Sequence, residues 1–235
     1  MKDIIILTLV LISFKSISYE SPRYPYHNFA YTGYQLGVYH GQDSIIPLAA
    51  SLNVDPSFEL NELLILDEAM KYLVDSVLDE KVIDCAYENS DREFPKTREY
   101  FKSQLYEIFT WRQNDGIFYP GQFYISQFNS DENVVGIAYL DLFYDRRNPL
   151  PGYKTKRYIH IALNSFYMGE HSEYFFSHNA AYWAGVIAHE ILHNLNYDHP
   201  NGYPGSFIKE YGNCIWREGG ISEETYFSER VISRD

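Results

Sequence analysis

The amino-acid sequence predicts an α+β domain, on three observations. Apolar residues recur at helical spacing after Pro56 and again after Pro95. Between residues 121 and 164 the pattern changes to stretches rich in β-branched and aromatic residues, which is typical of strands. A third helical pattern follows over residues 177–196. Helices that are separated along the chain from a group of strands favour an α+β arrangement.

Two helices are expected before the strands. The first begins at Ser57, whose side chain can cap it, and carries apolar residues at helical spacing: Leu60, Leu63, Leu64, Ala69, Tyr72, Leu73 and Val77. The second covers residues 96–111, and its apolar side is Phe101, Leu105, Ile108 and Phe109. The preceding segment, residues 19–56, is rich in Tyr, Gly and Pro, so we expect an irregular N-terminal segment or a pro-segment with short extended pieces.

The strands and the third helix come next. Residues 121–128, 133–145 and 157–166 are expected as strands, with antiparallel neighbours. The third helix can be capped by Ser177 or Asn179 and ends near Asn196. Trp183, Ile187, Ile191 and Leu195 give it an apolar stripe. A further helical stretch is expected near residues 207–214.

Composition and charge limit the classes of partner. The chain has 235 residues, enough for one domain over residues 19–235, which we expect to be a monomer. Its net charge is −13 and it has no basic cluster. Nucleic acid and anionic membrane surfaces attract positively charged proteins, so both are excluded as expected partners.

The N-terminus has the pattern of a signal peptide over residues 1–18. An apolar run from Ile4 to Phe14 follows Lys2 and is too short to span a membrane. Ser16 and Ser18 supply small residues before a cleavage point at Tyr19. A secreted or periplasmic protein is therefore expected. An uncleaved anchor and a buried N-terminal strand are the alternatives.

The chain has two cysteines, Cys85 and Cys214. In an oxidising compartment an even number of cysteines favours a disulfide. Two alternatives stay open at this point: two buried thiols, or one thiolate that binds a metal in an inhibited precursor.

The stretch AHEILHNLNYDH, residues 188–199, contains the residues that point to chemistry. His189 and His193 are four apart on the third helix, so their imidazoles project from one face and can bind one Zn²⁺ ion. Glu190 falls beside that face, where it can take a proton from a metal-bound water. His199 is the expected third ligand. Because it follows His193 by six residues, the helix must end and the chain must turn back.

The pattern His189-Glu190-Ile191-Leu192-His193, then Asn196 and His199, resembles the zinc signature of the metzincin metallopeptidases. Asn196 replaces the family's glycine, and asparagine is the side chain that best tolerates the left-handed backbone of such a turn. The resemblance implies a metzincin-like zincin fold: an upper lobe with a twisted mixed sheet and two long helices, a cleft under an edge strand, and a small irregular lower lobe.

The resemblance also implies a methionine turn beneath the metal, downstream of the third histidine. Here the methionines are Met1, Met70 and Met168, all upstream of it. Tyr211 and Cys214 are the candidates for the floor of the site in its place.

Other residues compete for these roles. Asp198 is an alternative third ligand, and Glu210, Glu218 and Glu223 would serve in a different zinc-peptidase clan. His160, His171 and His178 are expected to be structural or exposed. Tyr197, Tyr203 and Tyr211 are candidates for stabilising an oxyanion.

The expected function is that of a secreted zinc-dependent endopeptidase acting on a protein or peptide substrate. Zn²⁺ is bound by His189, His193 and His199, and Glu190 is the general base and then the general acid. The alternatives are a catalytically silent zinc-containing binding protein (an adhesin, toxin subunit or inhibitor) and a zinc hydrolase with a non-peptide substrate.

Overall fold

The protein was analysed as a computed structural model. It describes residues 27–39, 42–90, 97–112, 118–139, 158–170, 172–174, 176–195, 197–199 and 205–218. The expected signal peptide, residues 1–18, lies outside these ranges.

The described strands form one mixed sheet. They are β1 (His27–Tyr39), β2 (Gln42–Val54), β3 (Thr110–Arg112), β4 (Phe118–Phe128), β5 (Gly136–Ala138) and β6 (Tyr158–Asn164). Their order is β1-β2-β4-β6-β5, and β3 pairs with β4. β2, β4 and β6 are parallel, whereas β1 and β5 run antiparallel to their neighbours.

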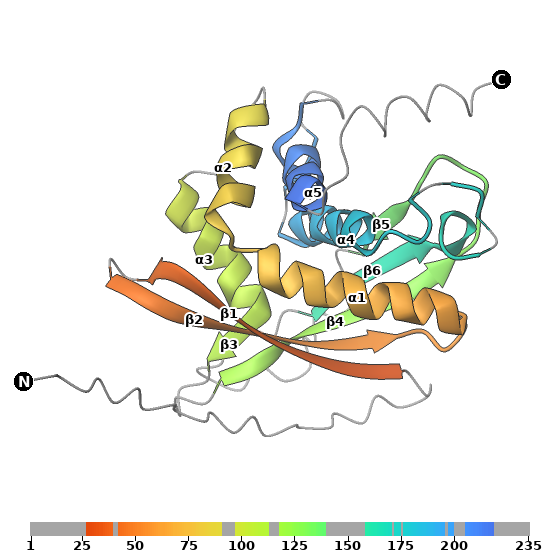
Figure 1. The fold of residues 1–235 in the computed structure, drawn as a ribbon, viewed down its shortest axis with the longest axis horizontal. Coiled ribbons are helices and arrows are strands. Elements are labelled where there is room, and N and C mark those ends of the chain that lie inside the picture. The colour runs from red at the N-terminus through yellow and green to blue at the C-terminus, as the bar shows by residue number, and fades with distance from the viewer. Residues whose placement is uncertain are drawn as a thin grey trace, which may run out of the picture.

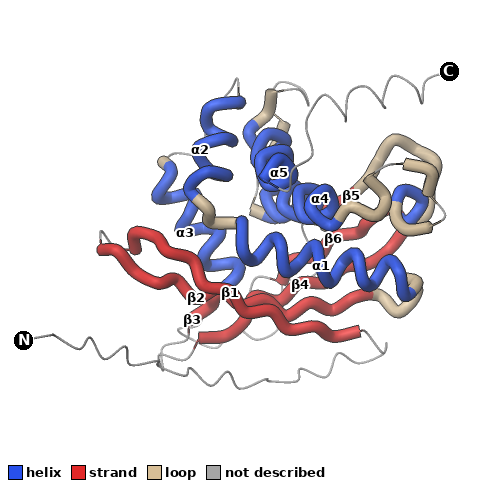
Figure 2. Tube along the Cα trace, in the orientation of Figure 1, coloured by secondary structure: helices blue, strands red, loops and turns tan. Residues whose placement is uncertain are grey.

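The helices cover one face of the sheet (Figures 1 and 2). They are α1 (Leu60–Ser76), α2 (Glu80–Asn89), α3 (Arg98–Phe109), α4 (Ala180–Asn194) and α5 (Phe207–Glu218), with a 3-10 turn at Ser165–Tyr167. α1 and α4 lie over the strands, and α5 packs on both α4 and α2. None of the described helices is long and apolar enough to cross a membrane.

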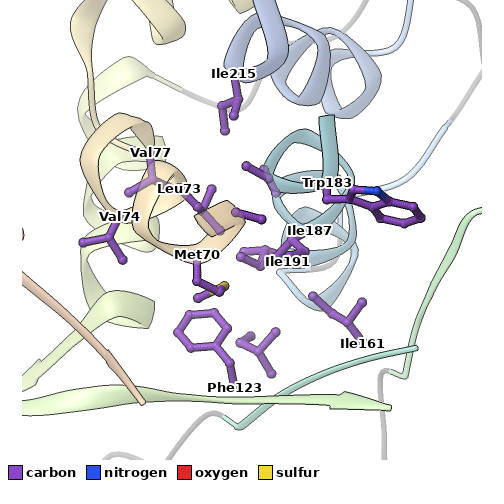
Figure 3. Close-up of a cluster of buried hydrophobic side chains, with 14 of the residues drawn as sticks. Met70, Leu73, Val74, Val77, Phe123, Ile161, Trp183, Ile187, Ile191 and Ile215 are labelled. Atoms are coloured by element: carbon purple, nitrogen blue, oxygen red, sulfur yellow. The ribbon is translucent and has the colours of Figure 1, made fainter. Parts of the chain in front are cut away.

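The hydrophobic core lies between the sheet and the helices. Figure 3 shows Met70 and Leu73 of α1 facing Ile187 and Ile191 of α4, with Phe123 of β4 beneath them. Phe123, Met70 and Leu73 are almost completely buried. The apolar stripe expected on the third helix is buried in this core and fixes α4 against the sheet. The stripe expected on the first helix is confirmed only in part, because Leu60 and Leu64 are exposed.

The mixed α/β architecture agrees with the expected helices and strands, but three local expectations are wrong. Residues 27–54 form the long antiparallel pair β1 and β2 instead of irregular structure. Of the described part of 133–145, only Gly136–Ala138 is strand, and residues 140–145 lie outside the described ranges. The expected antiparallel pairing holds for β5 and β6 but not for β4 and β6, which are parallel and are separated along the chain by residues 129–157.

Helix boundaries also differ: α3 covers Arg98–Phe109 rather than residues 96–111, and α1 begins later than expected. α1 begins at Leu60, and the N–H of Glu59 donates to the carboxylate of Glu62 over 2.7 Å, so Glu59 rather than Ser57 stands at the cap. Ser57 instead bonds to the Asp55 side chain in the preceding turn. In α4, Asn179 is the cap and accepts from the Tyr182 N–H over 2.9 Å, as expected.

Cys85 and Cys214 lie at disulfide distance and join α2 to α5, which confirms the expected pairing. The two cysteines are 129 residues apart in the sequence. A cross-link across such a long segment removes much of the conformational entropy of the unfolded chain.

We expect the Cys85→Ala/Cys214→Ala variant to lose about 2–4 kcal/mol of unfolding free energy, because its unfolded chain is less restricted. Urea unfolding of the variant and of the wild type measures the difference. Reduction of the wild type should give a similar loss, and an unchanged midpoint in both would show that the cross-link contributes nothing to stability.

Candidate metal centre

His189 and His193 lie near the C-terminal end of α4. They are one helical turn apart, and their ring centroids are 5.0 Å from each other. The helix ends at Asn194, and the Tyr197 N–H then bonds to the Leu192 carbonyl over 3.0 Å. This is the bond that closes the last turn of a helix while the chain reverses. Asn196, at the turn itself, lies outside the described residues.

The reversal brings His199 to the other two histidines. The centroid of its ring lies 5.1 Å from that of His189 and 5.1 Å from that of His193. One potential ligand nitrogen from each ring lies within 4.8 Å of the other two. The three histidines are therefore placed to bind one metal ion, as the sequence predicts.

Each imidazole is also held by a second partner. His193 Nδ1 lies 3.0 Å from the Tyr197 carbonyl, and His199 Nδ1 lies 2.7 Å from Ser206 Oγ. His189 hydrogen-bonds to the backbone of Ile208. Such partners fix the tautomer and the orientation of a metal-ligating histidine and leave its other nitrogen for the ion. The residues present therefore fit a metal ion.

The electrostatics favour neutral imidazoles, which are the metal-binding form. Burial, followed by the neighbouring His193 and His199, lowers the pKa of His189 to about 3. Burial and His193 also lower the pKa of His199. Both shifts favour the neutral form of these rings, so protons compete less with a metal ion.

Glu190 lies between α4 and the edge strand β5. Its side chain is buried, with 6% exposed, and it accepts a hydrogen bond from the backbone of Ala138. Burial raises its pKa to about 8, against the opposing effect of that hydrogen bond. A carboxyl group with a raised pKa beside a metal centre is typical of a group that moves protons.

β5 approaches Glu190 closely because it has a glycine at position 136. A Cβ on Gly136 would lie 3.0 Å from Glu190 Oε1 and 3.2 Å from a methyl carbon of Val186. The antiparallel pairing of β5 with β6 uses the backbone of Val135 and Tyr139. Gly136 and Ala138 therefore turn their backbone groups away from β6, and that of Ala138 reaches Glu190.

α5 forms the floor under His189. α4 and α5 cross at two glycines: a Cβ on Gly185 would lie 2.5 Å from the Gly212 carbonyl oxygen, and one on Gly212 would lie 2.7 Å from that of Gly185. A Cβ on Gly212 would also contact the Cβ of His189 at 3.4 Å. This close crossing puts Ile208 within hydrogen-bonding reach of the first histidine.

The side chains expected as the floor lie elsewhere on α5. Tyr211 is fully buried, its hydroxyl donates to the Val77 carbonyl, and its ring packs edge-on against Phe101. Cys214 is in the disulfide. Tyr197 donates its hydroxyl to Gln104. The phenol groups of Tyr197 and Tyr211 are thus bound to residues of the protein itself.

The alternative ligands are not part of the three-histidine cluster. Asp198 is exposed and accepts from the His199 N–H, and Glu210 is buried near Lys209 and Arg217. His160 Nε2 bonds to Ser126, and His178 is exposed. His171, Tyr203, Glu223 and the side chain of Glu218 lie outside the described residues.

Several residues of this site were not predicted from the sequence: Ser206, Ile208, Gly136, Gly185 and Gly212. The last two carry a signal that could have been used, because glycine inside a helix is unfavourable and often marks close packing. Ser206 and Ile208 act through tertiary contacts and have no such signal.

Comparisons with protein-family models, with curated proteins and with solved structures found no match to this chain. The resemblance to the metzincins therefore rests on the motif and on the arrangement of His189, His193 and His199.

We expect Ser206→Ala to weaken metal binding about 10- to 100-fold, because His199 loses the partner that orients its ring. Competition with a chromophoric chelator measures the affinity. Ser126→Ala is the matched control, since it also removes a hydroxyl from a histidine, His160, but away from the metal centre. Equal affinities for Ser206→Ala and wild type would contradict the role given to Ser206.

Proposed function

We propose that this protein is a zinc-dependent endopeptidase. One observation carries the proposal: three imidazoles converge on one point, and the buried carboxyl group of Glu190 comes from the residue next to the first of them. Metal-dependent hydrolysis requires three protein ligands, a base and a coordination position left open for water. The three histidines and Glu190 supply the ligands and the base.

Zinc is the metal that these ligands favour. Three histidines with no carboxylate or thiolate among them form a typical catalytic zinc set. When bound, zinc lowers the pKa of water and polarises the carbonyl group that is attacked. The protein's part is to hold the three rings through Tyr197, Ser206 and Ile208.

Glu190 is proposed as the proton carrier. Its carboxylate takes a proton from the attacking water and delivers it to the nitrogen of the leaving amine. The Ala138 backbone hydrogen bond keeps the carboxyl group in place through both steps. Burial raises the pKa of the Glu190 carboxyl group because it weakens solvation of the charged form. A cation bound nearby would lower that pKa again.

β5 is proposed to bind the substrate backbone. It is the last strand on its side of the described sheet, and Gly136 turns its backbone groups outward, whereas the Ala138 N–H is already bonded to Glu190. An extended peptide could add to such an edge as a further strand, which would bring a peptide bond to the metal. The mixed sheet with an antiparallel edge strand beside α4 is the arrangement that a metzincin-like fold would supply.

The proposal includes a secreted or periplasmic location and a protein or peptide substrate. The Cys85–Cys214 pair fits an oxidising compartment. The net charge of −13 supports the exclusion of nucleic acid as a partner.

We expect Glu190→Gln to keep one zinc per chain and to lose at least about 100-fold in cleavage rate, because the ligands remain but the base is removed. His193→Ala should lose the metal as well as the activity. Elemental analysis and digestion of an unfolded protein substrate, with and without chelator, measure both quantities. Zinc binding without cleavage by the wild type would favour the silent binding protein instead.

We expect Gly136→Ala to reduce cleavage without reducing zinc content, because its new methyl group pushes against the Glu190 carboxyl group. Ile137→Ala is the control, since it changes an exposed side chain on the same strand. Steady-state kinetics and elemental analysis decide the point. If Gly136→Ala cleaves as fast as Ile137→Ala, the position of Glu190 against β5 does not matter for catalysis.

A further inference from the structure

A pocket of about 230 Å³ opens beside the metal centre, between α4, α5 and the chain that leads into β5. His189 lines it, so the pocket adjoins the place where a metal ion would bind. Pockets for whole drug-sized ligands measure about 300–1,000 Å³. This smaller pocket therefore suits a single side chain or a chain end.

The walls of the pocket are of two kinds. The rings of Tyr182 and Trp216 meet edge to face, with centroids 4.7 Å apart, and offer an apolar surface. Asn133, Asn213 and Lys209 add polar groups. The backbone crossing at Gly185 and Gly212 forms part of the lining, so no side chain fills the space there.

Lys209 gives the pocket a positive charge. It is the only formally charged residue among the described residues that line the pocket. Behind it, the carboxylate of Glu210 lies 3.8 Å from Lys209 Nζ and 3.8 Å from an Arg217 nitrogen. Glu210 therefore interacts with both cations.

We propose that this pocket binds a carboxylate of the substrate, carried by the residue next to the scissile bond, and that Lys209 selects it. The proposal rests on the peptidase function above and gives it a substrate class. The carboxylate can come from an acidic side chain or from the C-terminus of a peptide. The rings of Tyr182 and Trp216 pack on the carbons that precede it.

The physical reason is the combination of position and charge. Successive Cα atoms are 3.8 Å apart, so a pocket lined by a metal ligand reaches a residue adjacent to the bond that is cleaved. A partly buried ammonium group, with a side chain 16% exposed, forms a stronger bond with a carboxylate than with an amide. The protein as a whole is acidic, with a net charge of −13, so a positively charged pocket would distinguish a substrate with a carboxylate at this position from one without it.

The test begins with cleavage sites. Wild-type protein loaded with zinc digests an unfolded protein, and mass spectrometry maps the cut bonds. Three blocked peptides, identical except for Glu, Gln or Leu at the selected position, then give kcat/KM values. A fourth peptide has Leu there and a free C-terminal carboxylate in place of the amide, which separates the two sources of the carboxylate.

We expect Glu, or the free C-terminus, to exceed Gln roughly 10- to 100-fold in kcat/KM, and Lys209→Met to remove the difference. Lys209→Arg should keep the preference, and Lys209→Glu should reverse it, so that the Gln peptide exceeds the Glu peptide. Lys71→Met is the matched control, because it makes the same charge change on the exposed surface of α1. A preference for Leu, or one that survives Lys209→Met, overturns the proposal.

Binding separates this proposal from the proposed activity. Calorimetry measures the affinity of the same peptides for the zinc-loaded Glu190→Gln variant and for its Lys209→Met double variant. Tighter binding of the carboxylate peptides that depends on Lys209 supports the pocket even if the wild type cleaves nothing, and then only the peptidase function fails. Equal binding of all four peptides, in protein that unfolds at the wild-type midpoint, overturns the pocket whatever the activity.

Discussion

The crossing of α4 and α5 is the constraint on which the candidate site depends. The helices meet backbone to backbone at Gly185 and Gly212, where any Cβ would overlap a carbonyl oxygen. Because they are this close, α5 reaches His189 through Ile208, and the turn before it brings Ser206 to His199. A wider separation would leave two of the three imidazoles without the partners that orient them. The glycines therefore serve the metal centre although neither can bind an ion.

The rest of the fold holds these two helices in place. α4 is fixed from below by the core shared with α1 and β4, and α5 is tied to α2 through Cys85 and Cys214 and to the end of α1 through the Tyr211 hydroxyl. On the side of β5, the backbone of Ala138 hydrogen-bonds to Glu190, and Gly136 allows the strand to approach it closely. The helices thus support the histidines, and β5, the strand proposed to bind the substrate, lies beside Glu190.

Local features of the sequence predicted the parts of the structure that depend on local interactions. The spacing of His189 and His193 follows from helix geometry. The Cys85–Cys214 pair is long-range, but a chain with two cysteines has only one possible internal disulfide. The parts that were missed depend on distant residues. β2 was read as irregular because of its composition, yet it pairs with β4, some 70 residues further along the chain. Ser206 looks like any loop serine until the fold places it 2.7 Å from His199. The shape of the edge near Glu190 likewise depends on how β5 pairs with β6.

The most direct test of this account is the X-ray absorption spectrum of the protein loaded with one equivalent of zinc. The account predicts a four-coordinate ion with three imidazole nitrogens at about 2.0–2.1 Å and one light, non-protein ligand. A spectrum with sulfur ligands, with fewer than three imidazoles, or with an oxygen-only octahedral shell would show that His189, His193 and His199 do not form the metal centre.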